Sequence, residues 1–157
     1  MTLAPLVEIE DLPKLLAPEA RLLGLDVGTK TVGLALSDVT RSIATPYHTI
    51  RRSKFTEDAN RIQQVIEKNQ VSALVIGLPL NLDGSEGPRA QSTRAFARNL
   101  AARVAVPIAF WDERLSTAAV ERHLIEADAS RKRRAEVIDR MAAAYILQGA
   151  LDRLKRL

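Results

Sequence analysis

Two short apolar segments separated by a glycine-containing turn begin the patterned part of the chain. They predict strands over residues 21–26 and 32–38, joined as a hairpin, with Asp26 at the end of the first strand. Residues 43–50 predict a third strand. Pro46 favours an edge position or an irregular start for this strand, because proline has no N–H group to donate to a neighbouring strand.

Helix-like and strand-like patterns alternate along the rest of the chain. Apolar residues at spacings near 3.6 indicate helices, and short, nearly continuous apolar runs indicate buried strands. The predicted elements are a helix over 54–69, a strand over 71–78, a helix that begins near Pro88, a strand over 107–112, a helix over 117–127 and a last helix from Ser130 to about Leu154. Turn-forming residues fill the loop from Pro79 to Gly87.

The order of these elements predicts the fold class. Three strands in hairpin order, followed by alternating helices and strands, favour an α/β domain with a mixed five-stranded sheet flanked by helices. The length of 157 residues suits one domain. We expect this domain to span residues 21–157. Residues 1–20 contain three prolines and are expected to form an N-terminal extension.

Charge and composition narrow the classes of partner. The 23 Lys and Arg residues exceed the 19 Asp and Glu residues, which gives a net charge of +4. Residues 1–20 carry one lysine and four acids, or −3, so residues 21–157 carry +7. A basic domain favours a polyanionic partner, nucleic acid first, although charge alone also fits an ordinary basic protein. The chain has no cysteine, which excludes disulfides and thiolate metal sites.

No sequence signal points to a membrane or to secretion. The chain has no run of 18 apolar residues. Its N-terminus lacks a basic segment followed by an apolar core, which a secretory signal requires. We therefore expect a cytoplasmic protein that makes no membrane contact.

Three carboxylates occupy positions where an isolated charge is costly. Asp26 ends an apolar strand, and Glu113 follows the strand over 107–112. The residues three and four positions from Asp139 on its predicted helix include no cation, and that helix face is small and apolar. Each acid also has a simpler interpretation. Asp26 could be a turn acid, Glu113 a solvated strand end, and Asp139 the partner of a distant arginine. Alternation along the strand leaves open whether Asp112 or Glu113 faces inward.

A divalent metal site explains the three acids together. Carboxylate ligands without histidine or cysteine favour Mg²⁺ or Mn²⁺. Two such ions roughly 4 Å apart can activate a water molecule and stabilise the leaving oxygen of a phosphodiester. The three acids would then be both the metal ligands and the catalytic groups of a nuclease.

Four motifs in the chain, within roughly residues 21–154, carry a family resemblance. They are Leu25–Lys30 with Gly33–Asp38, Val75–Pro79 with Asp83–Gly87, Asp112–Thr117, and Ile138–Ala143. In this order they resemble the motifs of the YqgF family. Members of this family are RNase H-like proteins, described as pre-16S rRNA nucleases or Holliday-junction-resolvase-like proteins.

The resemblance implies an RNase H-like fold and a hydrolase activity. It places the family's three acidic positions on Asp26, Glu113 and Asp139, and so selects Glu113 over Asp112. It also implies a metal-dependent endonuclease that acts on structured RNA, with 5′-end maturation of the 16S rRNA precursor in ribosome biogenesis as its role. Thr31 departs from the family pattern, in which a basic residue often follows the lysine.

Basic residues near the acids are candidate substrate contacts. Lys30 lies in the turn four residues beyond the first acid, where it could bind a phosphate. Arg131, Lys132 and Arg133 begin the last helix, where cations oppose the helix dipole, and this cost suggests a use in binding backbone phosphates. Arg114, in the third motif, is a further candidate. A solvated surface position remains an alternative for each of these residues.

Three other functions remain open. A Holliday-junction-type DNA resolvase needs a two-fold dimer to cut symmetric strands, and the chain has no strong dimer signature, so we expect a monomer or a weak homodimer. The glycine turn also resembles the first phosphate loop of actin-like and hexokinase-like proteins, but those need a second comparable domain, for which this chain is too short. A non-catalytic nucleic-acid-binding protein has no need for three acids that repel its partner.

Overall fold

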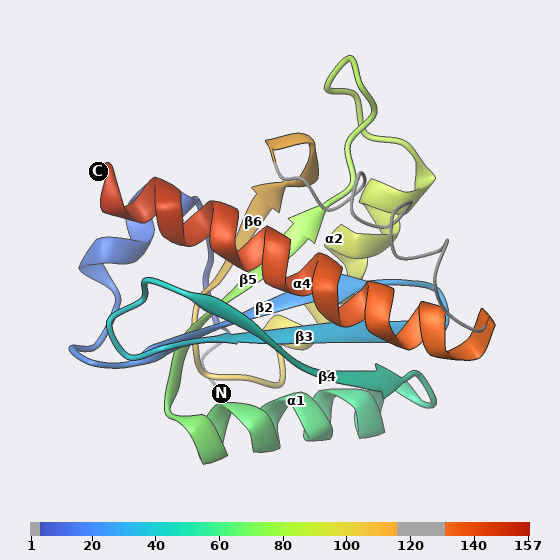
Figure 1. Ribbon diagram of the computed structural model, residues 1–157, viewed down its shortest axis with the longest axis horizontal. Coiled ribbons are helices and arrows are strands. Elements are labelled where there is room, and N and C mark those ends of the chain that lie inside the picture. Colours follow the sequence, from blue (N-terminus) through green and yellow to red (C-terminus); the bar gives the residue numbers. More distant parts are fainter. Residues whose placement is uncertain (1–3, 116–130) are drawn as a thin grey trace.

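Three antiparallel strands form one half of the sheet (Figure 1). They are β2 (Arg21–Val27), β3 (Thr31–Ser37) and β4 (Ala44–Arg51), and the hairpin predicted at the start of the domain is confirmed. A computed structural model describes residues 4–115 and 131–157 of the chain, and the side chains of residues 131–138 lie outside it. β4 is an edge strand, as Pro46 predicted, and its pairing with β3 shifts register beside this proline.

Parallel strands form the other half of the sheet. β5 (Val71–Leu78) pairs with β2 on one side and with β6 (Ile108–Asp112) on the other. A short strand, β1 (Leu6–Val7), pairs with β6 and completes the order β1-β6-β5-β2-β3-β4. The mixed sheet and the α/β class are confirmed. The sheet has six strands instead of the predicted five, because the N-terminal segment supplies one more.

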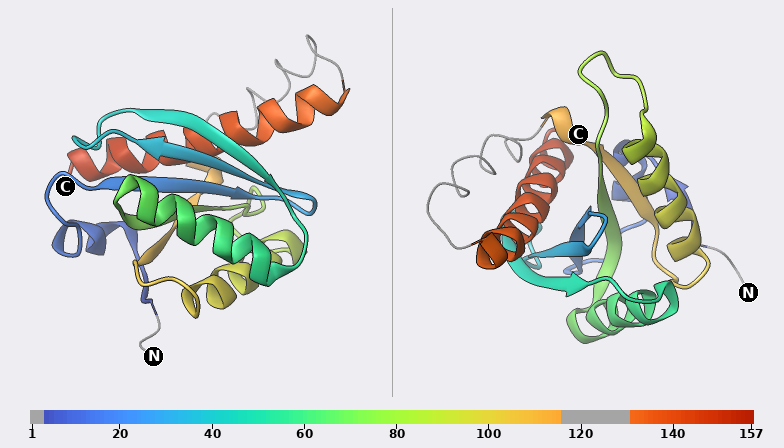
Figure 2. Two further views of the ribbon diagram at one scale, coloured as in Figure 1. Left: turned by 90° about the horizontal axis from the view of Figure 1, so that it is seen from below. Right: turned by 90° about the vertical axis from the view of Figure 1, so that its right-hand side faces the viewer.

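Helices cover both faces of the sheet (Figures 1 and 2). α4 (Arg131–Lys155) crosses one face over β2, β3 and β4, while α1 (Phe55–Asn69) and α2 (Pro88–Ala101) cover the other. These helices begin and end close to their predicted positions. The helix predicted over 117–127 lies outside the described residues. Within the part of the chain that is described, no helix is long and apolar enough to cross a bilayer.

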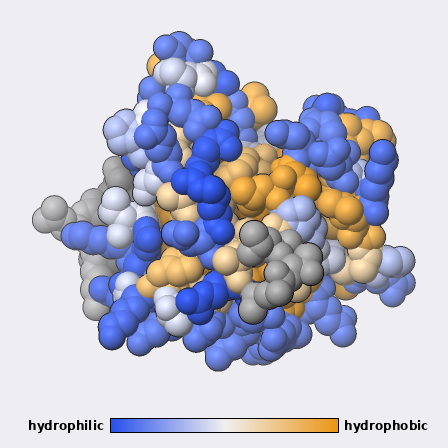
Figure 3. Space-filling model, turned by 180° about the vertical axis from the view of Figure 1, so that it is seen from behind, coloured by the Kyte–Doolittle hydropathy of each residue, from blue (hydrophilic) through white to orange (hydrophobic). Residues whose placement is uncertain are grey.

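Alternation along the strands divides the apolar core between the two faces of the sheet. In β2, Leu23 and Leu25 pack toward α1 and α2, whereas Leu22 packs toward α4. Asp26 lies four positions beyond Leu22 and therefore also faces α4. The side of the molecule away from α4 carries an apolar area bordered by hydrophilic side chains (Figure 3).

The N-terminal segment packs against the rest of the domain. The Ala4 N–H donates to the carbonyl of Ala101 at 3.0 Å, and the carbonyl of Pro5 accepts from the Ile108 N–H at 2.9 Å. A short 3₁₀ helix, η1 (Ile9–Lys14), follows β1 and buries Ile9 and Leu12 in the core beneath α4. The described part of the predicted extension is therefore integrated into the fold.

Candidate active site

Asp26 lies near the carboxyl end of β2, on the face covered by α4, and only 4% of its surface is exposed. In the antiparallel pair β2–β3 its partner is Gly33. In the parallel pair β2–β5, Leu25 lies opposite Ile76, so Asp26 stands beside the next residue, Gly77. Glycine on both neighbouring strands leaves space for other groups beside this carboxylate.

Glu113 uses the space above one of these glycines. It follows β6 as the first residue of the 3₁₀ turn η2 (Glu113–Leu115), and its Oε1 lies 2.7 Å from the position that a Cβ on Gly77 would take. β6 is not adjacent to β2, because β5 lies between them. Asp26 and Glu113 therefore approach one another across the glycine of the intervening strand.

Asp112 belongs to the opposite side of β6, where Phe110 packs into the core beneath α1 and α2. Its carboxylate accepts hydrogen bonds from Nη2 and Nε of Arg114, the shorter at 2.6 Å. This guanidinium holds the pKa of Asp112 below its usual value. The structure thus separates the two acids that the sequence left as alternatives: Asp112 pairs with an arginine and Glu113 reaches toward Gly77.

Arg114 also connects the end of β6 to the long loop that follows β5. Its Nη1 donates to the carbonyl of Leu82 at 3.0 Å, and Gly84 packs against its guanidinium. These bonds give Arg114 a bracing role inside the protein. Its predicted contact with substrate stays a prediction.

Asp139 approaches the same region from α4 and is half-buried. The hydroxyl of Thr31 donates a hydrogen bond to its Oδ2. A Cβ on Gly33 would fall on the backbone carbonyl of Asp139, so the helix lies directly against β3 at this point. Thr31 is a residue that the sequence interpretation missed, because it registered there only as a departure from the family pattern.

The three predicted acids therefore converge on one face of the sheet from β2, the turn after β6, and α4. Their donor chemistry fits Mg²⁺ or Mn²⁺, since all three offer carboxylate oxygens. Among the described residues, no three acids or histidines already stand close enough together to hold an ion.

The structure describes the side chain of one of the remaining predicted basic contacts, Lys30, but not those of Arg131, Lys132 and Arg133. Lys30 is exposed in the turn between β2 and β3, close to the carboxyl end of β2. Arg131, Lys132 and Arg133 form the first turn of α4, as predicted, but their side chains lie outside the described residues. Their role as substrate contacts stays a prediction.

A cleft of about 570 Å³ opens beside the turn that follows β2. The turn, the residues after β4 and the beginning of α2 form its walls. Its polar lining residues are Thr29, Arg52, Ser53, Arg89, Ser92 and Thr93. No carboxylate occurs among the described residues that line it, so the cleft suits an anionic group. We call it the arginine cleft.

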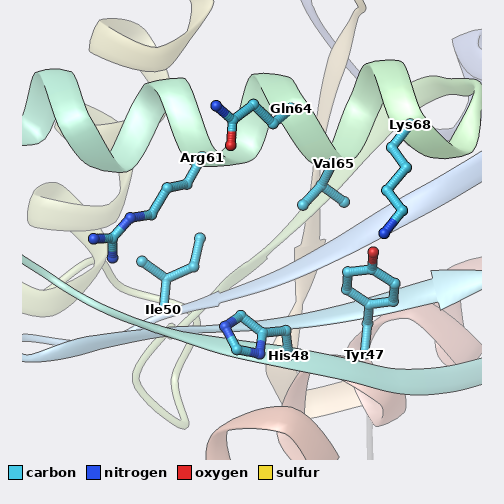
Figure 4. A pocket seen from close by; sticks show the side chains of 7 residues that line it. All are labelled: Tyr47, His48, Ile50, Arg61, Gln64, Val65 and Lys68. Carbon is cyan, nitrogen blue, oxygen red and sulfur yellow. The ribbon is translucent and has the colours of Figure 1, made fainter.

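A second hollow, of about 460 Å³, lies between the edge strand β4 and α1 (Figure 4). Lys68 projects from α1 toward Tyr47 on β4, and Arg61 and His48 lie further along the same groove. None of the predicted site residues whose side chains are described lines this groove, and α1 lies on the opposite face of the sheet from α4. It is therefore separate from the acidic site.

Comparison with known proteins places this chain in a family. A family model described as "RuvX: Holliday junction resolvase" matches residues 20–153. The chain belongs to this family. The resemblance to the YqgF family is thereby confirmed. The matched region contains all three acids, whereas β1 and η1 precede it.

Two similar proteins carry the name "Putative pre-16S rRNA nuclease". One, from Methylocella silvestris, is 62% identical over 154 residues, which are 98% of this chain and 96% of that protein. The other, from Paramagnetospirillum magneticum, is 62% identical over 148 residues, which are 94% of this chain and 96% of that protein.

Two solved structures share the fold at low sequence identity. RuvC from T. thermophilus, in complex with a Holliday junction substrate, matches with a TM-score of 0.57 and 14% identity, covering 87% of this chain and 96% of that one. The yeast mitochondrial Holliday junction resolvase matches with a TM-score of 0.50 and 11% identity, covering 90% and 82%. Both likenesses support the predicted RNase H-like architecture.

Proposed function

We propose that this protein is a metal-dependent endonuclease that cleaves a phosphodiester in structured RNA. We infer that its substrate is the 5′ region of the 16S rRNA precursor, which matches the name of its 62% identical relatives. One observation carries the proposal. Acids from three elements far apart in sequence, Asp26, Glu113 and Asp139, lie on one face of the sheet, with the Glu113 carboxylate over Gly77 and the Asp139 backbone against Gly33.

The carboxylates have distinct tasks in this proposal. Asp26 is buried on the rigid strand β2, so it holds the least mobile ligand position. Glu113 and Asp139 supply ligands from a turn and a helix, which allows them to adjust as the site closes. When bound, Mg²⁺ or Mn²⁺ activates a water molecule and neutralises charge on the phosphodiester; two ions suit a site with three carboxylates.

Thr31 keeps the helix carboxylate directed at the sheet. Its hydroxyl donates to Asp139, so the acid on α4 is positioned by the hairpin that also carries Asp26. Lys30, exposed beside this hairpin, is suitably placed to hold a phosphate of the substrate as a point charge. In this proposal the same hairpin contributes one positioning residue, Thr31 at the start of β3, and one substrate contact, Lys30 in the turn.

A Holliday junction resolvase is the second candidate, favoured by the description of the matching family model. A resolvase cuts two symmetric strands and so needs two active sites related by a two-fold axis. We expect a monomer or weak homodimer in the cytoplasm, and such a protein suits cleavage of an RNA better than symmetric cleavage of a DNA junction. A purely binding protein is disfavoured, because buried and half-buried carboxylates repel a polyanion.

The test is a cleavage assay with Mg²⁺ or Mn²⁺ that compares wild type with Asp26→Asn. The substrates are a 16S precursor 5′ segment, an unstructured single-stranded RNA and a four-way DNA junction. We expect cleavage of the precursor, loss of that activity on addition of EDTA, and at least a 100-fold loss in the folded variant, in the range that removing a group central to catalysis costs.

Other results reassign the function. Paired nicks in the junction without cleavage of the RNA would favour the resolvase. Near-normal turnover by a folded Asp26→Asn protein would contradict the acidic site itself. Calorimetric titration with Mn²⁺ supplies an independent readout, since the variant should bind the ion more weakly than wild type whatever the substrate is.

A further inference from the structure

The arginine cleft offers a second group of polar side chains at the same end of the sheet as the acids. Arg52 and Arg89 reach it from opposite walls, one after β4 and the other in the first turn of α2. Ser92 and Thr93 line it with hydroxyl groups, and Thr93 is only 3% exposed. Two guanidinium groups and two hydroxyls are typical of a site that binds a phosphate.

Arg52 is held in place before any ligand arrives. Its Nη1 donates to the carbonyl of Gly28 at 2.6 Å, and its guanidinium lies over the ring of Phe96, 5.2 Å from the centroid. An arginine has five N–H donors in a planar fork, so the other N–H groups can still donate to a ligand. Less side-chain entropy is lost on binding because this side chain is already ordered.

Two acids, Glu57 and Asp58, lie next to the cleft without being among the described residues that line it. The hydroxyl of Ser53 donates to Glu57 at 2.8 Å, and its backbone N–H donates to Asp58 at 3.1 Å. Both acids therefore accept hydrogen bonds from Ser53 at the beginning of α1, and Ser53 itself forms part of the cleft wall. The anion-binding groups of the cleft are the two arginines.

The position of the cleft relates it to the acids. The carbonyl of Gly28 accepts the hydrogen bond from Arg52, and Gly28 is two residues beyond Asp26. In an extended chain the Cα atoms of two such residues are roughly 7 Å apart. Successive nucleotides of a nucleic acid strand cover a similar distance. The acids face α4 and the cleft lies beside α2, so a strand that runs over the carboxyl end of β2 from one face of the sheet to the other would present one phosphate to the acids and the next to the cleft.

We propose that the arginine cleft binds the backbone phosphate adjacent to the one that is cleaved, through Arg52 and Arg89. This proposal rests on the proposed function for its substrate, a nucleic acid strand. The volume of about 570 Å³ lies within the range of pockets that enclose small ligands, so it accommodates a nucleotide unit. The cleft sets the register of the strand relative to the acids.

The experiment measures binding in the Asp26→Asn background, so that cleavage does not alter the probe. The probe is the fluorescently labelled 16S precursor 5′ segment, titrated by anisotropy at several KCl concentrations. The variants are Arg89→Ala and Arg52→Lys, and the matched control is Arg98→Ala, an exposed arginine on the same helix outside the cleft. A urea midpoint for each protein verifies that it is folded.

We expect Arg89→Ala to weaken binding about 10-fold, and to lower the slope of log K against log salt by about 0.7, the loss of one phosphate contact on a single strand. Arg52→Lys retains the charge but loses the planar fork, so we expect weaker binding with a slope closer to that of the parent. Arg98→Ala should change affinity less than about twofold.

Equal effects of Arg89→Ala and Arg98→Ala, with unchanged salt slopes, would overturn the proposal. Cleavage by the wild type together with such equal effects would reject the cleft and leave the nuclease function intact. Arginine-dependent binding by a protein whose wild type cleaves none of the substrates would instead support the cleft and reject the nuclease.

Discussion

Replacement of Gly77 by alanine moves a carboxylate of the candidate site without removing it. The added Cβ would lie 2.7 Å from Oε1 of Glu113, whereas ordinary contact begins at 3.4 Å. The carboxylate must therefore move by about 0.7 Å, the difference between these distances. The nearest atom to the added Cβ is Cδ1 of Ile146, which lies closer than the carboxylate, and Cγ1 of the same side chain lies at 3.0 Å; both are near the end of a side chain that can adjust.

The expected effect falls mainly on activity. Catalytic groups must be held within about 0.5 Å of their productive positions, and a misplacement of about 1 Å can cost 100-fold in rate. We therefore expect Gly77→Ala to lower the cleavage rate by about 10-fold to 100-fold. The loss of stability should be about 1 kcal/mol, the low end for overpacking, because only flexible side-chain atoms obstruct the new methyl group.

Gly24→Ala provides a control on the same face of the sheet. Its Cβ would lie 2.7 Å from Cβ of Leu147 and 3.0 Å from the carbonyl oxygen of Ala143, both near the backbone of α4. These atoms move only if the helix moves, so we expect a destabilisation of about 2–3 kcal/mol. No acid of the site is among the atoms it meets.

The assay combines single-turnover cleavage of the precursor RNA with urea unfolding followed by tryptophan fluorescence. Trp111 is the only tryptophan in the chain, and it is buried where Gly149 of α4 packs against its ring, so it reports docking of this helix. With a urea dependence of about 2 kcal/mol/M, Gly24→Ala should lower the midpoint by about 1 M and Gly77→Ala by about half as much. Cleavage at the wild-type rate by folded Gly77→Ala would contradict this prediction. A larger loss of activity in Gly24→Ala than in Gly77→Ala, in proportion to their losses of stability, would also contradict it.

Three further predictions concern the surroundings of the acids. Gly33→Ala should prevent docking of α4, because its Cβ would coincide with the helix backbone. The fluorescence of Trp111 without urea should then show an exposed ring, and fluorescence like that of the wild type would contradict the prediction. Thr31→Val should leave the fold stable but reduce cleavage about 10-fold, because the α4 carboxylate loses the hydrogen bond from Thr31; an unchanged rate would contradict this role. Arg114 lowers the pKa of Asp112 in the folded protein. The pair therefore stabilises the fold at pH values above the unfolded carboxyl pKa of about 3.9, and this stabilisation is lost as the pH falls from there through the lower pKa of the folded state. The stability difference between wild type and Arg114→Ala should therefore shrink below about pH 4, and a difference independent of pH would contradict the pairing.

Much of the fold follows from local patterns. Alternating and continuous apolar runs predicted the strands that became β2 to β6, and 3.6-residue spacing predicted α1, α2 and α4. Pro46 marked an edge strand for a purely local reason, the missing N–H group. The two-residue strand β1 was missed, because so short a segment carries no period and gains its pairing only from β6.

Local sequence patterns were enough to select candidate carboxylates, since an acid at the end of a buried strand or on an apolar helix face is recognisable without any neighbour; the choice of Glu113 over Asp112 needed the family resemblance. Their arrangement in space depends on the fold as a whole. Strand order placed β5 between Asp26 and Glu113, Gly77 let one acid pass over it, and the close approach of α4 gave Asp139 its bond from Thr31. The physical reason is that strand pairing and helix docking join residues far apart in the chain, so their outcome depends on the packing of the whole core.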